Sequence, residues 1–303
     1  MPDRVHRSTC AACLGELRGS FVVEGFAYLR CRACGTLNLD QAPSAERLAK
    51  LYQRDDTWTS LKDAGLDDPG AEERETRLRL KFLRRVGANL ERVFELGPGR
   101  GYLARALAAR GSRVTALELH AGANERLRSG GIAAVSELEE LEGQYDTILL
   151  WGVIEHLEDP FVALSTLQEH VAPGGSIVIL TEDSSSWLAR LSGVRWAALE
   201  PPEHIVLFSR RGLTLCLARL GFELAASARW PATVRAMVST ALGRERGLKL
   251  RRRFREARLA AHQGRGPRGP IRVAKRILDT PLWPLSEHIL YRFARAPVMA
   301  PRP

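Results

Sequence analysis

A glycine-rich turn between a buried strand and a helix constrains this chain more than any other feature. The apolar run 92–96 predicts a strand, and the spacing of apolar residues in 102–110 predicts a helix. Between them lie Gly97, Gly99 and Gly101, which let the backbone bend sharply and let a ligand lie against it. The helix that follows presents free backbone N–H groups at its first turn. The stretch therefore predicts a nucleotide-type binding site.

A second predicted strand, residues 112–119, carries an acidic side chain near its tip. This residue is Glu118, seventeen positions beyond Gly101. A carboxylate in this position accepts two hydrogen bonds from the diol of a ribose. The glycines follow the spacing G-x-G-x-G rather than the G-x-G-x-x-G of dinucleotide sites, which disfavours NAD and FAD.

Four of the five cysteines form two closely spaced pairs near the N-terminus. Cys10 and Cys13 are separated from Cys31 and Cys34 by seventeen residues, with room for a short hairpin between the pairs. This is the spacing of a four-thiolate zinc site, in which a filled coordination sphere makes the ion structural. Metal binding would also supply the folding energy of so short a segment. Two disulfides or a redox pair are the alternatives, and disulfides fit a reducing compartment poorly.

The positive charge of the chain is concentrated in one segment. The 303 residues carry a formal charge of +10, yet residues 243–276 alone contain thirteen Lys or Arg and two Glu. The alternating residues 287–295 predict a further strand, so we interpret 233–286 as a basic helical insertion before it.

Three interpretations of this insertion stay open. It binds an anionic substrate or nucleic acid, it contacts an anionic membrane surface through residues 243–285, or it is a solvated lid or dimer surface. Nucleic acid is the less favoured partner. Proteins bind single-stranded nucleic acid by stacking its bases on aromatic side chains, and Phe254 is the only Phe, Tyr or Trp within 243–276.

Four motifs in order resemble a known enzyme class. They are E-L-G-P-G-R-G (95–101), the acidic Glu118, YDTILLWGVIEHLEDP (145–160) and VAPGGSIVIL (171–180). Together they resemble class I S-adenosylmethionine-dependent methyltransferases. With the cysteine pairs in front, the layout is similar to sugar C-methyltransferases and other natural-product methyltransferases that carry an N-terminal zinc-binding module. The chain departs from the sugar enzymes because their further α/β domain is missing.

The resemblance implies an α/β fold with a Rossmann-like sheet of seven strands and helices on both faces. We expect a four-cysteine zinc ribbon in residues 1–42 and a helical connector that caps the active site in 43–90. The methyltransferase core would cover 91–232, followed by the basic helical insertion 233–286 and by the last strand and C-terminal tail, 287–303.

The resemblance also implies which residues hold the cofactor S-adenosylmethionine, whose product is S-adenosylhomocysteine. Its methionine part would be surrounded by Glu95, Gly97, Gly99 and Gly101, and its ribose would be held by Glu118.

Aromatic residues extend this predicted site. Trp151, at the end of the strand 145–151, is expected beside the cofactor. Tyr52 and Trp58 precede the first strand, where similar enzymes carry an aromatic segment that closes over cofactor and substrate. The alternative is that these two residues only pack the zinc module against the core.

The catalytic candidates are histidines. Glu203 and His204 lie in a long segment, predicted to be irregular, that ends at residue 207. They resemble a Glu-His segment that zinc-bearing sugar C-methyltransferases use near the transferred methyl, so both would face the substrate. A histidine titrates near the working pH and can take the proton of the acceptor. His156 is a second candidate base, and the alternative role of His204 is to cap the helix 210–220.

The sequence as a whole predicts a methyltransferase for a small-molecule or lipid-like biosynthetic intermediate, with oxygen or carbon as the acceptor atom. The Asn/Asp-Pro-Pro-aromatic tetrad typical of adenine N-methylation is absent after Trp151. The alternatives are an RNA methyltransferase and a non-catalytic interaction protein. The N-terminus lacks the apolar core of a signal peptide, so we expect a cytoplasmic protein, peripheral at the membrane if the insertion contacts lipid.

Overall fold

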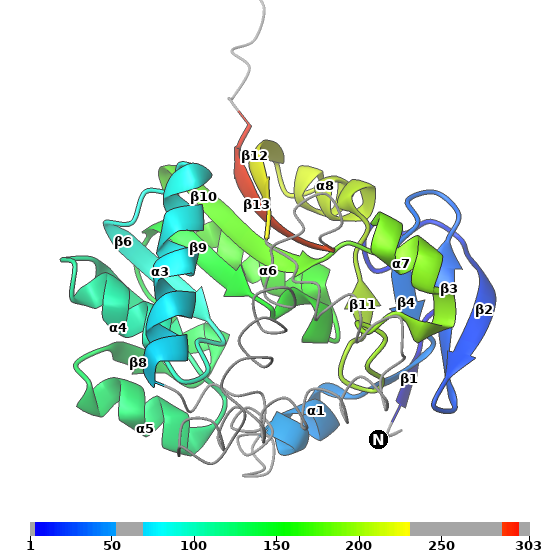
Figure 1. The fold of residues 1–303 in the computed structure, drawn as a ribbon, viewed down its shortest axis with the longest axis horizontal. Coiled ribbons are helices and arrows are strands. Elements are labelled where there is room, and N and C mark those ends of the chain that lie inside the picture. Colours follow the sequence, from blue (N-terminus) through cyan, green and yellow to red (C-terminus); the bar gives the residue numbers. More distant parts are fainter. Residues whose placement is uncertain (1–3, 53–68, 231–286, 297–303) are drawn as a thin grey trace, which may run out of the picture.

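The computed structural model describes residues 4–52, 69–230 and 287–296 (Figure 1). Trp58 and the basic insertion 233–286 lie outside the described residues. Among the helices that the structure describes, none combines the length and the apolar character needed to cross a membrane.

The core is a seven-stranded sheet in the order β12-β13-β10-β9-β6-β7-β8. In chain order its strands are β6 (Arg92–Leu96), β7 (Arg113–Leu117), β8 (Ala133–Val135), β9 (Tyr145–Trp151), β10 (Val171–Glu182), β12 (Phe222–Arg229) and β13 (His288–Arg295). Strands β8, β7, β6, β9 and β10 are parallel, and β13 runs antiparallel between β10 and β12. The strand predicted at 287–295 is therefore confirmed, and it lies inside the sheet.

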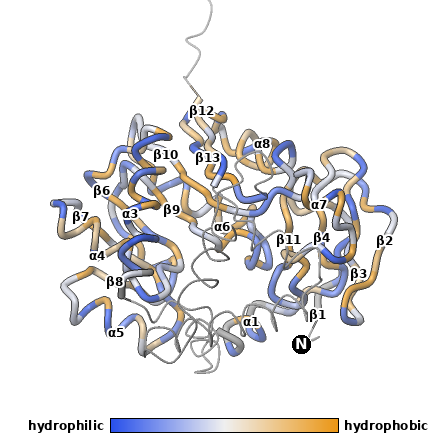
Figure 2. Tube along the Cα trace, in the orientation of Figure 1, coloured by the Kyte–Doolittle hydropathy of each residue, from blue (hydrophilic) through white to orange (hydrophobic). Residues whose placement is uncertain are grey.

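Helices cover both faces of this sheet, as predicted. The helices α3 (Pro69–Arg85), α4 (Tyr102–Ala108) and α5 (Ala121–Ser129) pack on one face, and α6 (Pro160–Glu169) and α8 (Arg210–Ala218) pack on the other. Side chains alternate between the faces along each strand. In β9, Leu149 and Trp151 pack on the α3 face, whereas Ile148 and Leu150 pack on the α6 face. Figure 2 shows the central strands as mostly hydrophobic. This is the class I methyltransferase fold.

The N-terminal segment forms a small sheet of its own. The hairpin predicted between the cysteine pairs is present as β2 (Leu17–Val23) and β3 (Phe26–Cys31), followed by β4 (Leu37–Leu39). The short strands β1 (Arg4–His6) and β5 (Gln41–Pro43) pair with each other, and α1 (Ala45–Tyr52) leads away from them.

A strand from the middle of the chain completes this small sheet. β11 (Val206–Leu207) pairs antiparallel with β4, which gives the order β11-β4-β3-β2. The N-terminal module therefore docks on the segment that follows His204. Figure 1 shows it beside α7 and β11, at the end of the molecule opposite α4 and α5.

The prediction of an irregular segment between residues 181 and 207 is partly wrong. The segment contains α7 (Trp187–Ser192) and a 3-10 turn, η4 (Gly193–Arg195). The serine before α7 explains the helix, because the Ser186 hydroxyl accepts a hydrogen bond from the Ala189 N–H and caps the first turn. Two further 3-10 turns are η2 (Leu138–Glu140) and η3 (Ile154–His156).

Candidate active site

The predicted site residues converge at the carboxyl ends of parallel strands. Glu95 and the glycine turn end β6, Glu118 follows β7, and Trp151 ends β9. Open α/β sheets bind ligands at this edge, where the loops that follow the strands meet.

The three glycines of the turn all adopt a left-handed backbone, with φ of 64°, 59° and 70° at Gly97, Gly99 and Gly101. A Cβ at Gly97 would lie 2.8 Å from Val153 Cγ2, and one at Gly101 would lie 2.4 Å from Leu127 Cδ2. At Gly97 and Gly101 a side chain would therefore be strained by the left-handed backbone and would also have to displace a neighbouring side chain. A Cβ at Gly99 would meet no heavy atom within 4 Å, so Gly99 leaves open space against the backbone.

Glu118 is held in place by backbone groups of the same edge. Its carboxylate accepts hydrogen bonds from the Gly99 N–H and the His120 N–H, each at 3.0 Å. Burial raises its pKa above the ordinary value, and these two donors oppose the rise. A carboxylate has about four acceptor positions, so a ribose diol can bind beside the two backbone donors.

The side chain of Glu95 is buried in surroundings that disfavour its charged form. Its side chain is 1% exposed, and Oε2 has no hydrogen-bond partner among the described residues. Burial raises the pKa of Glu95 to about 7, although the nearby Arg79 guanidinium opposes this. A buried carboxylate oxygen without a donor fits a cationic ligand. The amino group of S-adenosylmethionine meets this requirement, so the donor set of the turn fits that cofactor.

Of the two predicted aromatic cofactor residues, the structure describes the side chain of Trp151 but not that of Tyr52. The Trp151 ring packs under the Arg79 guanidinium, 5.0 Å from its centroid, and edge-on against Trp230 at 5.1 Å. It ends β9, the strand next to that of Glu95. Tyr52 is the last residue of α1, and the structure does not describe its side chain.

A polar network that sequence analysis did not anticipate ties α3 to the glycine turn. The Tyr102 hydroxyl donates to the Glu72 carboxylate, and Arg100 Nη1 lies 3.1 Å from the Tyr102 hydroxyl. The network holds the first turn of α4 against α3. A positive residue between two glycines and an acidic residue at a helix start were the only signals in the sequence.

The two candidate histidines meet although they are 48 positions apart in the chain. The ring centroids of His156 and His204 lie 4.6 Å apart, with an interplanar angle of 80°. His156 Nδ1 lies 3.1 Å from the Glu203 carbonyl oxygen, and His204 Nδ1 lies 2.7 Å from the Ala198 carbonyl oxygen. A carbonyl only accepts, so both Nδ1 atoms carry a proton, and in the neutral form of each ring the lone pair is on Nε2.

Glu203 contributes its backbone to this arrangement, since its carbonyl orients His156. Burial, together with the neighbouring His204, lowers the pKa of His156 to about 3. His156 is therefore a neutral ring at physiological pH.

Buried acidic residues surround the histidines, and sequence analysis missed their role. Glu155 accepts a hydrogen bond from the Thr181 hydroxyl at 2.9 Å, and Glu182 lies 3.2 Å from His288 Nε2. Glu182 ends β10, and Glu155 lies in η3 just after the adjacent strand β9, which is the signal that could have paired them. Burial and the neighbouring Glu182 raise the pKa of Glu155 well above its ordinary value.

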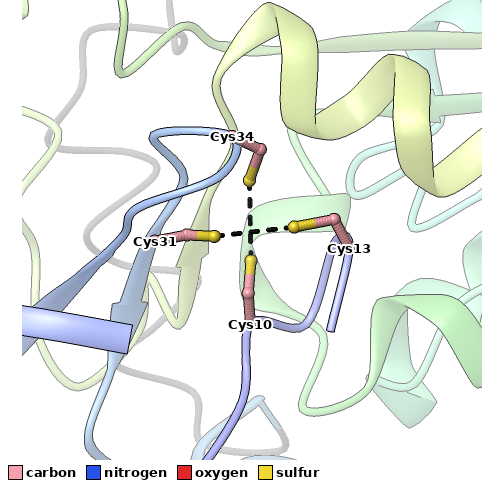
Figure 3. A group of neighbouring side chains, drawn as sticks. All are labelled: Cys10, Cys13, Cys31 and Cys34. Carbon is pink, nitrogen blue, oxygen red and sulfur yellow. Dashed lines mark hydrogen bonds between the residues drawn. The ribbon is translucent and has the colours of Figure 1, made fainter. Parts of the chain in front are cut away.

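The four cysteines of the N-terminal module converge on one point (Figure 3). The Sγ atoms of Cys10 and Cys34 lie 3.7 Å apart, and those of Cys13 and Cys31 lie 3.5 Å apart. Four sulfurs about 2.3 Å from a tetrahedral zinc lie about 3.8 Å from one another. The arrangement fits a zinc ion, and its geometry is that of four separate thiols rather than two disulfides.

Comparison with known proteins places this site in a family. The family model described as a methyltransferase domain matches residues 71–227, from α3 to β12. The chain belongs to this methyltransferase family. The matched residues include the glycine turn, Glu118, both candidate histidines and Glu203, whereas the cysteine module lies outside them.

Relatives of known name cover a smaller part of the chain. The ubiquinone biosynthesis O-methyltransferase of Pseudomonas aeruginosa is 30% identical over 116 residues, which are 34% of this chain and 50% of that protein. The protein of the same name from Serratia proteamaculans is 28% identical over 141 residues, 42% of this chain and 58% of its own length. This chain thus spans about half the length of the curated relatives it matches.

A solved structure shares the fold. The magnesium protoporphyrin IX methyltransferase of Synechocystis PCC 6803 superposes with a TM-score of 0.50 at 13% identity, covering 84% of this chain and 100% of that one.

Proposed function

We propose that this protein transfers the methyl group of S-adenosylmethionine to an oxygen or carbon of a small-molecule or lipid-like biosynthetic intermediate. One observation carries the proposal: the carboxyl ends of β6 and β7 bring the buried Glu95, the open Gly99 and the backbone-held Glu118 to one place. Family membership supports the reaction type, since the match covers all three residues.

The three residues have distinct tasks in binding the cofactor. Glu95 would face the amino group of the methionine part, Gly99 would let the cofactor lie against the backbone, and Glu118 would hold the ribose diol. Once bound, S-adenosylmethionine supplies a methyl group on a positively charged sulfur. Positioning that methyl against the acceptor atom would supply much of the rate.

The acceptor has to lose a proton, and the histidine pair is suited to promote that loss. The hydrogen bond of His204 to the Ala198 carbonyl leaves the lone pair on Nε2, as a general base requires. His156 offers the same tautomer, and its lowered pKa makes it a weak base. Glu203, through its carbonyl, would position His156.

The acceptor class follows the named relatives. Two of them are called ubiquinone biosynthesis O-methyltransferases, names that describe O-methylation in a biosynthetic route. For this chain they favour oxygen as the acceptor atom. The basic segment 243–276 would then attract an anionic substrate or an anionic membrane surface.

A structural zinc ion in the cysteine cluster completes the proposal. Zinc would bind Cys10, Cys13, Cys31 and Cys34 and leave no position open for catalysis.

The cofactor site is tested by substitutions at Gly99, where a side chain meets open space. We expect Gly99→Asp to weaken S-adenosylmethionine binding at least a hundredfold, because a carboxylate would occupy the cofactor's place beside Glu118. Gly99→Asn has the same size and tolerates a left-handed backbone equally well, so it separates charge from bulk. Isothermal titration measures both affinities, and circular dichroism checks the fold. Unchanged affinity in Gly99→Asp would overturn the assignment of the site.

A further inference from the structure

The reaction of the proposed function has to send one proton out of the site in each turnover. The sulfur that loses the methyl group goes from positively charged to neutral, so a neutral acceptor releases a proton to water overall. In the proposed function, His204 Nε2 takes that proton first. The His204 side chain is only 8% exposed, so the proton needs a further group in order to reach solvent.

The groups that hold the His204 ring do not take this proton. Nδ1 lies 2.7 Å from the Ala198 carbonyl oxygen, which accepts a hydrogen bond but is not protonated at physiological pH. The His156 ring meets that of His204 at 4.6 Å, and its pKa, lowered to about 3 by burial and by His204, keeps it neutral. From β3, the Tyr28 hydroxyl donates to the backbone carbonyl of His204.

Two buried acidic side chains near His204 are already engaged. An oxygen of Glu155 lies within 4.8 Å of a ring nitrogen of His204. Burial and the neighbouring Glu182 raise the pKa of Glu155 well above its ordinary value, which favours the protonated carboxyl, a poor proton acceptor. Glu182 interacts electrostatically with His204, but it lies 3.2 Å from His288 Nε2. Although burial opposes the change, this contact raises the pKa of His288 to about 9, so Glu182 is paired with an imidazolium.

Glu200 is a third carboxylate beside the ring, and it also has contact with solvent. Its Oε2 lies 3.9 Å from His204 Nε2, and its side chain is 37% exposed. The backbone fixes this pairing, because the Glu200 carbonyl accepts hydrogen bonds from the N–H groups of Glu203 and His204, each at 2.9 Å. A small side-chain rotation would bring the two atoms within hydrogen-bond distance, and catalytic contacts are often longer in ligand-free proteins than during reaction.

We propose that Glu200 carries the proton of the acceptor from His204 to solvent. The proton leaves the acceptor atom and bonds to His204 Nε2, while the electron pair of that atom forms the bond to the transferred methyl. The imidazolium then gives the proton to the Glu200 carboxylate, which passes it to water and is regenerated, so no further reactant is needed. The inference rests on the proposed function and deepens it. Glu200 acts through His204 and is therefore a positioning residue.

Titration of the His204 ring by nuclear magnetic resonance tests the pairing without any acceptor. In the full chain labelled with nitrogen-15 histidine, the signals of His204 are those that His204→Ala removes. We expect Glu200→Gln to lower the pH midpoint of the His204 titration by about half a unit or more, because the lost carboxylate no longer stabilises the imidazolium.

Glu223→Gln is the matched control, since it removes the same charge from an exposed residue of β12. Glu223 lies beside Ala294, which pairs with Ser176, whereas Glu182 lies at the opposite end of β10. We expect this variant to leave the His204 titration unchanged.

Turnover tests the path of the proton. Methyl-labelled S-adenosylmethionine is supplied together with the small-molecule fraction of a cell extract as the source of acceptor. We expect Glu200→Gln to transfer methyl about tenfold more slowly than wild type, with unchanged affinity for S-adenosylmethionine. The acidic limb of its pH–rate profile should move to lower pH with the His204 midpoint, which a merely structural role would not cause. Glu200→Asp, or acetate added to Glu200→Gln, should restore part of the rate.

The possible failures of this experiment are distinguishable. Equal His204 midpoints in wild type and Glu200→Gln, or equal rates of methyl transfer by the two proteins, would overturn the role of Glu200 alone. A rate that acetate and Glu200→Asp both fail to restore would also overturn it. A wild-type protein that neither binds S-adenosylmethionine nor transfers its methyl group would instead refute the proposed function.

Discussion

Glu95 is a residue whose burial lowers the stability of the unliganded protein and whose proposed role is to bind the cofactor. Its carboxylate is buried with one oxygen lacking a donor in the described part of the chain, which is unfavourable unless a cation binds there. Gly99, four residues further along the chain, is not required by packing either, since a Cβ there would meet no heavy atom within 4 Å; the proposed function assigns it to cofactor binding.

The raised pKa of Glu95 predicts a pH dependence with a definite sign. Its pKa is about 7 in the folded state and 4.5 ordinarily. Below pH 4 the group is protonated in both states, so it has no effect. Between pH 4.5 and 7 the unfolded chain ionises first, and the unliganded protein loses about 3 kcal/mol of stability, a loss that persists above pH 7.

Glu95→Gln should therefore stabilise the unliganded protein relative to wild type by about 3 kcal/mol at pH 8 and have little effect at pH 4. The same variant should bind S-adenosylmethionine more weakly at pH 8. Urea unfolding at both pH values measures the first effect, with the exposed Glu91→Gln as control. Equal stability of Glu95→Gln and wild type at pH 8 would contradict this prediction, because the buried carboxylate would then not destabilise the folded protein.

Among the elements, the two-residue strand β11 joins the cysteine module to the segment that carries His204. It pairs with β4 of the cysteine module, the Tyr28 hydroxyl donates to the His204 carbonyl at 2.8 Å, and the Ser209 hydroxyl donates to the Cys34 carbonyl at 2.5 Å. Ser209 also caps α8 by accepting from the Gly212 N–H. The cysteine module thus holds the segment that carries His204.

Loss of the proposed zinc ion should therefore affect the segment that carries His204, the proposed general base. In Cys13→Ser, we expect the amides of Val206 and Leu207 to exchange at least tenfold faster with deuterium. Methyl transfer should fall more than S-adenosylmethionine binding, because the cofactor residues follow β6 and β7 rather than β11. Cys216→Ser is the control, since Cys216 lies in α8 outside the cluster. Unchanged exchange at β11 in a zinc-free protein would mean that the module folds and docks without metal.

Local patterns in the sequence predicted the elements but not their long-range pairing. The glycine turn, the paired cysteine spacing and the strand at 145–151 follow from local spacing and apolar runs, and the structure has all three. The pairing of β11 with β4 joins Val206 to Asn38, far apart in the chain, and no local pattern encodes it.

The buried acidic group shows the same limit within the candidate site. Glu155, Glu182 and His288 meet because β9, β10 and β13 are neighbours in the sheet, so the cluster exists only once the topology is known.

In the molecule as a whole, the candidate sites are arranged in a line along the sheet. Glu118, the proposed ribose ligand, follows β7 toward one edge of the sheet, and the glycine turn follows β6. His156, with His204 beside it, follows β9, and the cysteine module docks beyond this pair. In the proposed function, this order separates cofactor binding from acceptor chemistry. The residues proposed for both tasks lie within the family's matched region, residues 71–227, and the cysteine module lies outside it.

The most direct test of the central claim is transfer of label from methyl-labelled S-adenosylmethionine into a fractionated extract of the cells that express this protein. We predict label in the small-molecule or lipid fraction, resistant to nuclease and absent when Gly99→Asp replaces the wild-type protein. Mass spectrometry of the labelled compound would then identify the acceptor atom. Label that nuclease removes from the RNA fraction would contradict the account and make the basic segment a nucleic-acid contact.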